Sequence, residues 1–218
     1  MITQTVQDYL KIIYKLGSKG ETVTTNAIAE RLNVSQASVT GMIKKLAELK
    51  LVTHTPYRGV ELTQAGRKIA LEIIRHHRLL ELYLAQALGY SWDEVHDEAE
   101  KLEHVISEDF ETRMAEALGN PTTDPHGAPI PSKDGEIVER SLVPLTQAKA
   151  GQRVTIEQVS DSDPTMLRYL GDLGIYPKVE IDVLEKAPFD GPLLIQLGDN
   201  QHHLGETVTD NILVSAVR

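Results

Sequence analysis

Residues 95–105 read VHDEAEKLEHV, a stretch that predicts a helix carrying several potential metal ligands. A helix turns by about 100° per residue, so with His96 at zero Glu100 lies near about 40°. Glu103 then lies near about −20° and His104 near about 80°. Four side chains that can bind metal therefore share roughly a quarter of the helix circumference. Apolar residues fall on the adjacent arc and predict a buried side.

A second helical segment, HHRLLELYL at residues 76–84, offers His77 and Glu81 four positions apart on one face. Each segment alone is also compatible with a solvated charged stripe. Imidazoles and carboxylates at helical spacing on two neighbouring helices together favour a metal site. Its ligands are oxygen and nitrogen, because the chain has no cysteine.

The composition is that of an ordinary globular protein. The 218 residues are enough for one or two domains, with 41% hydrophobic and 25% charged residues. The absence of cysteine excludes disulfides, zinc–thiolate clusters and a thiol nucleophile. No apolar run approaches the roughly 18 residues of a membrane span, and the N-terminus does not resemble a signal peptide. We expect a cytoplasmic protein without a membrane partner.

Charge is distributed unevenly along the chain. The net charge of −10 would ordinarily disfavour nucleic acid, yet residues 1–75 have a balance of +5 and residues 76–218 one of −15. A basic front and an acidic remainder are typical of a DNA-binding module joined to a cation-binding module. Chance clustering would produce the same asymmetry, so the DNA-binding interpretation needs support from motifs.

The basic front predicts a winged helix-turn-helix. A helix at 5–16 is followed by NAIAERL, capped by Thr24 or Thr25, and by a tight turn at Asn33–Val34. Ser35 caps the next helix, QASVTGMIKKLAELK, whose apolar residues recur at helical spacing. The following LVTHTPYRGVELT predicts two short strands, a wing with Arg58 at its tip.

The second helix of this motif would read DNA. Small or polar side chains near its start are free to approach base edges, and two lysines and the wing arginine suit phosphate contacts. The predicted DNA-binding residues are Ser35, Gln36, Ala37, Ser38, Thr40, Lys44, Lys45 and Arg58.

The rest of the chain predicts helices, then a linker, and then a domain of short strands. Thr63 caps a long helix to about Leu88, Ser91 caps the metal-candidate helix, and a further helical stretch covers residues 108–118. A Pro- and Gly-rich segment at 119–135 predicts a linker, in which His126 is a loop residue without a helical partner. From residue 142 short alternating runs, with one helix at 164–173, predict a small, strongly bent β-barrel. The fold class is therefore mainly α with a small β domain.

These motifs resemble the diphtheria-toxin-repressor family of metal-dependent transcriptional regulators. The winged helix, HRLLE, VHDEA…EHV and DPHGAPIP carry the resemblance. Residues 142–218 are similar to the Src-homology-3-like domain of the family's longer members and to the small ferrous-transport accessory protein. The resemblance implies a DNA-binding domain at 1–63, a helical dimerisation and metal-binding domain at 64–140, and the β domain at 141–218.

The resemblance also implies two metal sites. One would use Asp8, Glu100, Glu103 and His104. The other would use His77, Glu81 and His96, completed by a carboxylate from the β domain, for which Asp163 is the candidate, while Met166 stands at the position of an expected amide.

The first of these sites has the ligand types of the family's manganese-responsive branch. Asp8 and Glu100 match that branch, whereas iron-responsive members usually have Met and Cys there. Lys11 departs from it, because a Glu is usual at that position. We therefore expect Mn²⁺, alternatively Fe²⁺.

The function expected is that of a homodimeric, metal-activated repressor that binds a double-stranded DNA operator and controls metal homeostasis. We do not expect it to be an enzyme. Two alternatives remain, a winged-helix regulator whose acidic stripes bind no metal and a carboxylate-bridged di-metal enzyme. Such enzymes usually carry Glu-x-x-His on two helices, but Lys101 and Ile74 stand three positions before His104 and His77.

Overall fold

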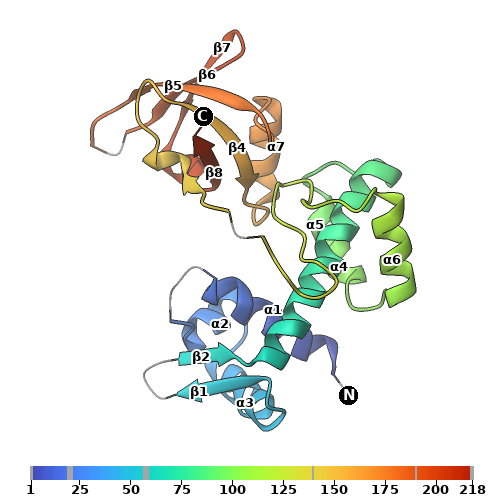
Figure 1. Cartoon of the computed structure of the whole chain (residues 1–218). Helices are drawn as coiled ribbons and strands as arrows, with labels where there is room; N and C mark the ends of the chain where they lie inside the picture. The colour runs from blue at the N-terminus through green and yellow to red at the C-terminus, as the bar shows by residue number, and fades with distance from the viewer. Residues whose placement is uncertain (1, 19–21, 56–58, 139, 190, 217–218) are drawn as a thin grey trace. The chain divides into compact units, whose positions relative to one another are not determined.

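The computed structural model describes residues 2–18, 22–55, 59–138, 140–189 and 191–216 (Figure 1). The chain divides into two compact units. Unit 1 comprises residues 1–76, 103–106 and 131–136, and unit 2 comprises residues 77–102, 107–130 and 137–218. No helix in the described ranges has both the length and the apolar character that crossing a membrane requires.

Unit 1 begins with three helices whose start points follow from capping side chains. They are α1 (Gln4–Gly17), α2 (Thr25–Leu32) and α3 (Gln36–Glu48). The side chains of Thr3, Thr24 and Ser35 accept hydrogen bonds from backbone N–H groups in the first turns of these helices. Of the two threonines predicted as caps of α2, the structure uses Thr24.

The turn between α2 and α3 makes the helix-turn-helix. Asn33 adopts a left-handed conformation (φ 52°), which an asparagine tolerates better than most residues. Its N–H donates to carbonyls in the last turn of α2, which ends the helix. The apolar faces of the three helices meet in one core that includes Leu10, Ile28 and Ile43.

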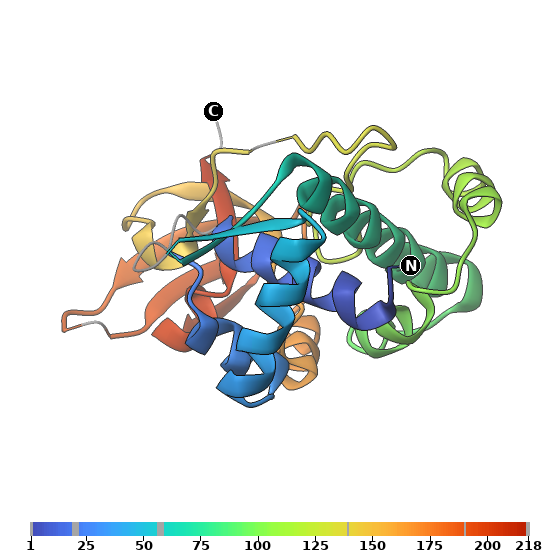
Figure 2. The ribbon, with the colours of Figure 1, turned by 90° about the horizontal axis from the view of Figure 1, so that it is seen from below.

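A two-stranded antiparallel hairpin, β1 (Val52–Thr55) and β2 (Gly59–Leu62), follows α3 and forms the predicted wing. Strand β1 packs beside α3, as Figures 1 and 2 show. Thr63 then caps α4 (Gln64–Leu88) by accepting a hydrogen bond from the Gly66 N–H. Arg58, predicted at the tip of the wing, lies outside the described residues.

The helix predicted from VHDEAEKLEHV is shorter than expected. Helix α5 spans Val95–Leu102, and Glu103 and His104 lie in the turn that follows it. The prediction that Glu103 and His104 lie on one continuous helix with His96 and Glu100 is therefore wrong. Ser91 does not cap α5 either, because its hydroxyl donates to Glu94 in a turn before the helix. Helix α6 (Glu108–Ala117) starts at a capping Ser107.

The C-terminal part of unit 2 is a six-stranded antiparallel sheet in the order β3-β8-β4-β5-β6-β7. The strands and helices of this part of the chain are β3 (Val143–Pro144), η1 (Leu145–Gln147), β4 (Arg153–Val159), α7 (Pro164–Asp172), β5 (Glu180–Lys186), β6 (Leu193–Leu197), β7 (Asn200–Leu204), α8 (Glu206–Thr209) and β8 (Ile212–Ala216). Irregularities in register between β4 and β8 and between β5 and β6 bend the sheet. Alternate side chains of the strands and the buried face of α7 form the core.

Candidate metal centre

Three side chains of unit 1 form the first candidate site, named here the α1 cluster: Asp8, Glu103 and His104. Asp8 comes from α1, and the other two come from the turn after α5. His104 Nε2 lies 2.9 Å from Asp8 Oδ1 and 3.4 Å from Glu103 Oε1. One ligand atom from each residue lies within 4.8 Å of the other two, a spacing at which one cation can contact all three.

Two further residues of α1, Gln7 and Lys11, contact members of this cluster. His104 Nδ1 lies 2.9 Å from the Gln7 side-chain oxygen, so the Nδ1–H donates there and Nε2 is directed toward Asp8. Holding one ring nitrogen by a hydrogen bond is the usual way in which a ligand histidine is oriented. Lys11 is buried, and its ammonium donates to both oxygens of Glu103.

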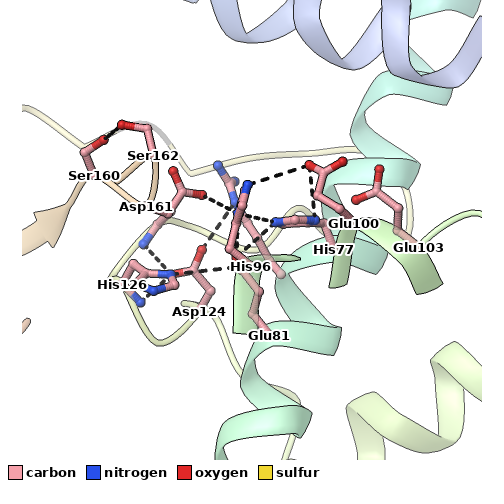
Figure 3. A network of polar contacts seen from close by, with 12 residues as sticks. His77, Glu81, His96, Glu100, Glu103, Asp124, His126, Ser160, Asp161 and Ser162 are labelled. Carbon is pink, nitrogen blue, oxygen red and sulfur yellow. Dashed lines mark hydrogen bonds and ion pairs between the residues drawn. The ribbon is translucent and has the colours of Figure 1, made fainter. Parts of the chain in front are cut away.

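Unit 2 contains a second group, named here the α4 cluster: His77, Glu81, His96 and Asp161 (Figure 3). His77 and Glu81 lie on α4, His96 on α5, and Asp161 in the loop between β4 and α7. Glu81 Oε1 lies 2.9 Å from His77 Nε2 and 3.2 Å from His96 Nδ1. Asp161 Oδ2 lies 3.4 Å from His96 Nδ1.

The other oxygen of Glu81 faces a third group, which includes Asp124 and His126 of the linker. His126 Nε2–H donates to the Trp92 carbonyl at 2.6 Å, which leaves Nδ1 directed at Glu81 Oε2, 3.8 Å away. Among the described residues, these two buried atoms have no hydrogen-bond partner. Such atoms are costly to bury, and a cation between them would satisfy both.

The pKa values of this region favour protonated histidines beside an ionised Glu81, and a bound cation would replace those protons. Burial acts to lower the pKa of His96, but the carboxylates of Asp161 and Glu81 outweigh it and raise that pKa to about 10. Burial is likewise outweighed at His126, where Glu81 and then Asp124 raise the pKa to about 9. The three surrounding histidines, led by His77, overcome burial and hold the pKa of Glu81 well below its usual value. Burial and the neighbouring Glu81 raise the pKa of Asp124 to about 7.

A tight turn positions His126. Asp124 Oδ1 accepts hydrogen bonds from the N–H groups of His126 and Ala128, each at 2.9 Å. The His126 carbonyl accepts a hydrogen bond from Val159 N–H at the end of β4. Gly127 is held against β4, and the linker is thereby fixed to the β domain.

The structure brings most of the predicted ligands together in two groups. Asp8, Glu103 and His104 lie together, and so do His77, Glu81 and His96. Glu100 was predicted to join Asp8, Glu103 and His104, but its Oε1 lies 3.8 Å from His77 Nδ1 and 3.9 Å from His96 Nε2, next to the α4 cluster.

Among the described residues, Asp163 is not grouped with the ligands of the α4 cluster. Asp163 caps α7, accepting hydrogen bonds from Thr165 and Met166, and Asp161 is the carboxylate near His96. A capping role is the ordinary use of an aspartate before a helix that begins with proline.

His126 is a loop residue as predicted, but its position beside Glu81 of α4 was not predicted, and neither was Asp124 as a site residue. Their signal in the sequence was D-x-H-G, in which an aspartate can accept backbone hydrogen bonds two residues on and a glycine allows a close approach. That pattern does not reveal which helix the histidine meets.

The predicted DNA-binding residues of α3 lie on its exposed face. Gln36, Ala37 and Ser38 are exposed at the start of the helix. Thr40, Lys44 and Lys45 are exposed further along it, while Val39, Ile43 and Leu46 face the core. Ser35 caps the helix and its hydroxyl contacts that of Ser38.

Fold and clusters together define a class of protein, a winged-helix DNA-binding protein that carries carboxylate–imidazole sites suited to divalent metal ions. Cysteine is absent from the sequence, so these sites consist of hard or borderline ligands.

Comparison with known proteins identifies the family. Residues 1–60 match the N-terminal DNA-binding domain of iron-dependent repressors, and residues 63–132 match their metal-binding and dimerisation domain. Residues 143–216 match the FeoA domain. The chain belongs to the diphtheria toxin repressor family of metal-dependent DNA-binding transcriptional repressors, which are not enzymes. The predicted family, fold class and general function are confirmed.

Relatives include repressors named for two metals. The iron-dependent repressor IdeR of Mycobacterium leprae is 34% identical over 229 residues and 99% of each chain. A solved manganese-dependent transcriptional repressor in complex with manganese is 39% identical, with a TM-score of 0.92 over 97% of this chain and 100% of that one. The structure of the manganese regulator SloR is 32% identical, with a TM-score of 0.80 over 97% of this chain and 98% of that one.

Proposed function

We propose that this protein is a homodimeric repressor, activated by manganese, that binds a double-stranded DNA operator in the cytoplasm and controls manganese uptake. The observation that carries the proposal is the α1 cluster. Asp8 belongs to the first helix of the DNA-binding domain, whereas Glu103 and His104 follow α5 of the metal-binding domain. A cation shared by these three residues ties one domain to the other.

The proposed mechanism is a shift of population. Binding of a divalent cation to Asp8, Glu103 and His104 favours the arrangement in which α1 is held against the turn after α5. A metal can act in this way only if it binds that arrangement more tightly than the alternatives. In a dimer, the fixed arrangement sets the spacing of the two α3 helices on two half-sites of DNA.

The ligand types support manganese as the activating ion. Carboxylate and imidazole suit manganese(II) and iron(II), whereas sulfur ligands would increase the preference for later metals. Asp8 and Glu100 provide oxygen where the family's iron-responsive members are expected to have sulfur. Two of the solved relatives described above are named for manganese.

The α4 cluster is proposed as a second cation site. His77, Glu81, His96 and Asp161 supply two imidazoles and two carboxylates, and His126 faces the second oxygen of Glu81. Because Glu81 uses its two oxygens on two sides, a cation held there would also order the linker around His126. This site would stabilise the linker and the β domain.

Exposed apolar side chains on the metal-binding domain support a homodimer. Leu88 at the end of α4, Tyr90 after it and Phe110 on α6 are exposed by 58%, 40% and 44% of their surface. Residues 63–132 match a domain described as metal binding and dimerisation. These side chains are therefore candidates for contacts between two copies of that domain.

The test uses DNA binding at controlled free metal concentration under anaerobic conditions. Bound sequences are first selected from a pool of random DNA duplexes with manganese present, and binding to them is then measured against manganese, iron and zinc. We expect manganese to activate binding and Asp8→Ala to abolish the activation, with Asp97→Ala on the exposed side of α5 as control. Binding that is independent of metal would refute the proposal, and activation by iron alone would refute its manganese assignment.

A further inference from the structure

Lys11 makes an unusual contact with a predicted metal ligand. Its ammonium nitrogen lies 2.7 Å from Oε1 and 2.8 Å from Oε2 of Glu103. Lys11 is exposed by only 3% and Glu103 not at all. Lysine and glutamate are rarely buried to this extent unless they are paired.

The same carboxylate faces the α1 cluster. Glu103 Oε1 lies 3.4 Å from His104 Nε2, which is itself 2.9 Å from Asp8 Oδ1. A cation held by these ligand atoms would share Glu103 with the Lys11 ammonium. An ammonium has only donors and cannot act as a metal ligand while it is protonated, so Lys11 and the metal have like charge and one carboxylate between them.

We propose that Lys11 is a built-in competitor for the metal, and that its ammonium determines the free metal concentration at which the α1 cluster fills. This inference rests on the proposed function of that cluster. Without metal, Lys11 neutralises a buried carboxylate that would otherwise be costly to the fold. With metal, Lys11 repels the arriving cation across a poorly solvated space.

Both effects of the Lys11 ammonium lower the affinity of the α1 cluster for metal. Losing the ammonium destabilises the metal-free state and removes a repulsion from the metal-bound state, so the affinity for metal rises. Coupling between two ligands is reciprocal, and between sites it is ordinarily worth about five- to 150-fold in affinity. We therefore expect removal of the charge at Lys11 to increase the manganese affinity of the α1 cluster about tenfold or more.

The experiment compares three variants of the full-length protein. Lys11→Met keeps the length and apolar character of the side chain and removes the charge, whereas Lys11→Arg keeps the charge. Lys15→Met changes the half-buried lysine one turn further along α1 and serves as the matched control. Manganese binding is measured by calorimetry, and the binding step lost in Asp8→Ala is assigned to the α1 cluster. Thermal unfolding of the metal-free protein is the second readout.

The expected result has three parts. Lys11→Met binds manganese about tenfold or more tightly at the assigned step, and its metal-free form unfolds at a lower temperature. Lys11→Arg and Lys15→Met keep the affinity of the unchanged protein. If Lys11→Met folds only when manganese is present, the metal replaces the ammonium as partner of Glu103, which also supports the proposal.

Other results overturn it. An unchanged or weaker affinity in Lys11→Met means that the ammonium does not compete with metal. Failure of Lys11→Met to fold even at saturating manganese means that the ammonium does something that a cation in the cluster cannot replace. A wild-type protein that binds no manganese at the Asp8-dependent step would instead refute the proposed function of the cluster, and the inference with it.

Discussion

Replacing Gly127 by alanine should separate the linker from β4 and displace His126 from Glu81. Gly127 is buried and has a φ of 86°. A Cβ atom placed on it would lie 2.0 Å from the carbonyl oxygen of Glu157 and 3.0 Å from the Cα of Gln158. Both atoms belong to the backbone of β4, so no side chain can rotate to make room.

The cost has two parts. A non-glycine residue with a positive φ costs roughly 1–2 kcal/mol. Forcing atoms into a filled space typically costs a further 1–3 kcal/mol or so. Gly119→Ala is the matched control, because Gly119 has a φ of 75° and nothing within 4 Å of its added Cβ. We expect about 2–5 kcal/mol for Gly127→Ala and only the first part, about 1–2 kcal/mol, for Gly119→Ala.

Trp92 provides the assay because it is the one tryptophan of the chain. Its ring stacks on that of His126, with 5.7 Å between the ring centroids, and contacts the ring of Tyr176, with 4.7 Å between the centroids. Urea unfolding followed by tryptophan fluorescence gives the change in stability, and the native spectrum reports whether Trp92 has lost its neighbours. Equal destabilisation by the two glycine substitutions, with unchanged native spectra, would show that the linker does not depend on this close approach.

Three further predictions concern the sites. Lys44→Ala should weaken binding to all DNA sequences alike and reduce the slope of log affinity against log salt concentration by about one unit. Titrations at several salt concentrations measure this slope, and an unchanged slope would mean that Lys44 does not face a phosphate. Asp161→Asn should weaken metal binding at the α4 cluster, whereas Asp163→Asn should leave it unchanged because asparagine also caps helices; calorimetry giving the reverse order would contradict the geometry. The pKa values of His96 and His126 are raised above 6.5, to about 10 and about 9. Protonation of these two histidines therefore stabilises the metal-free fold fully below about pH 6.5, and this contribution should decrease as the pH rises toward 9. Denaturation in chelator from pH 6.5 to 9 tests this, and a stability that increases over that range would disagree with it.

Much of the architecture is encoded locally. The helix-turn-helix followed from the capping residues Thr24 and Ser35 and from the spacing of apolar residues on α3, since both depend on only a few neighbouring residues. His77 and Glu81 share a face of α4 for the same reason. Strand β7 (Asn200–Leu204) was not predicted, because its residues are mostly polar and exposed and show no alternation of apolar and polar side chains.

The sequence by itself indicated that His77 and Glu81 share one helix face and that His96 lies on the next helix, because helical periodicity relates residues three or four positions apart. Only the tertiary structure decided how they combine. Asp161 rather than Asp163 approaches His96 because the start of α7 uses Asp163 as its cap. His126 meets Glu81 because the linker is held against β4, and Lys11 meets Glu103 across 92 positions of sequence. Such partners are set by the packing of distant segments, and no local pattern of residues encodes that packing.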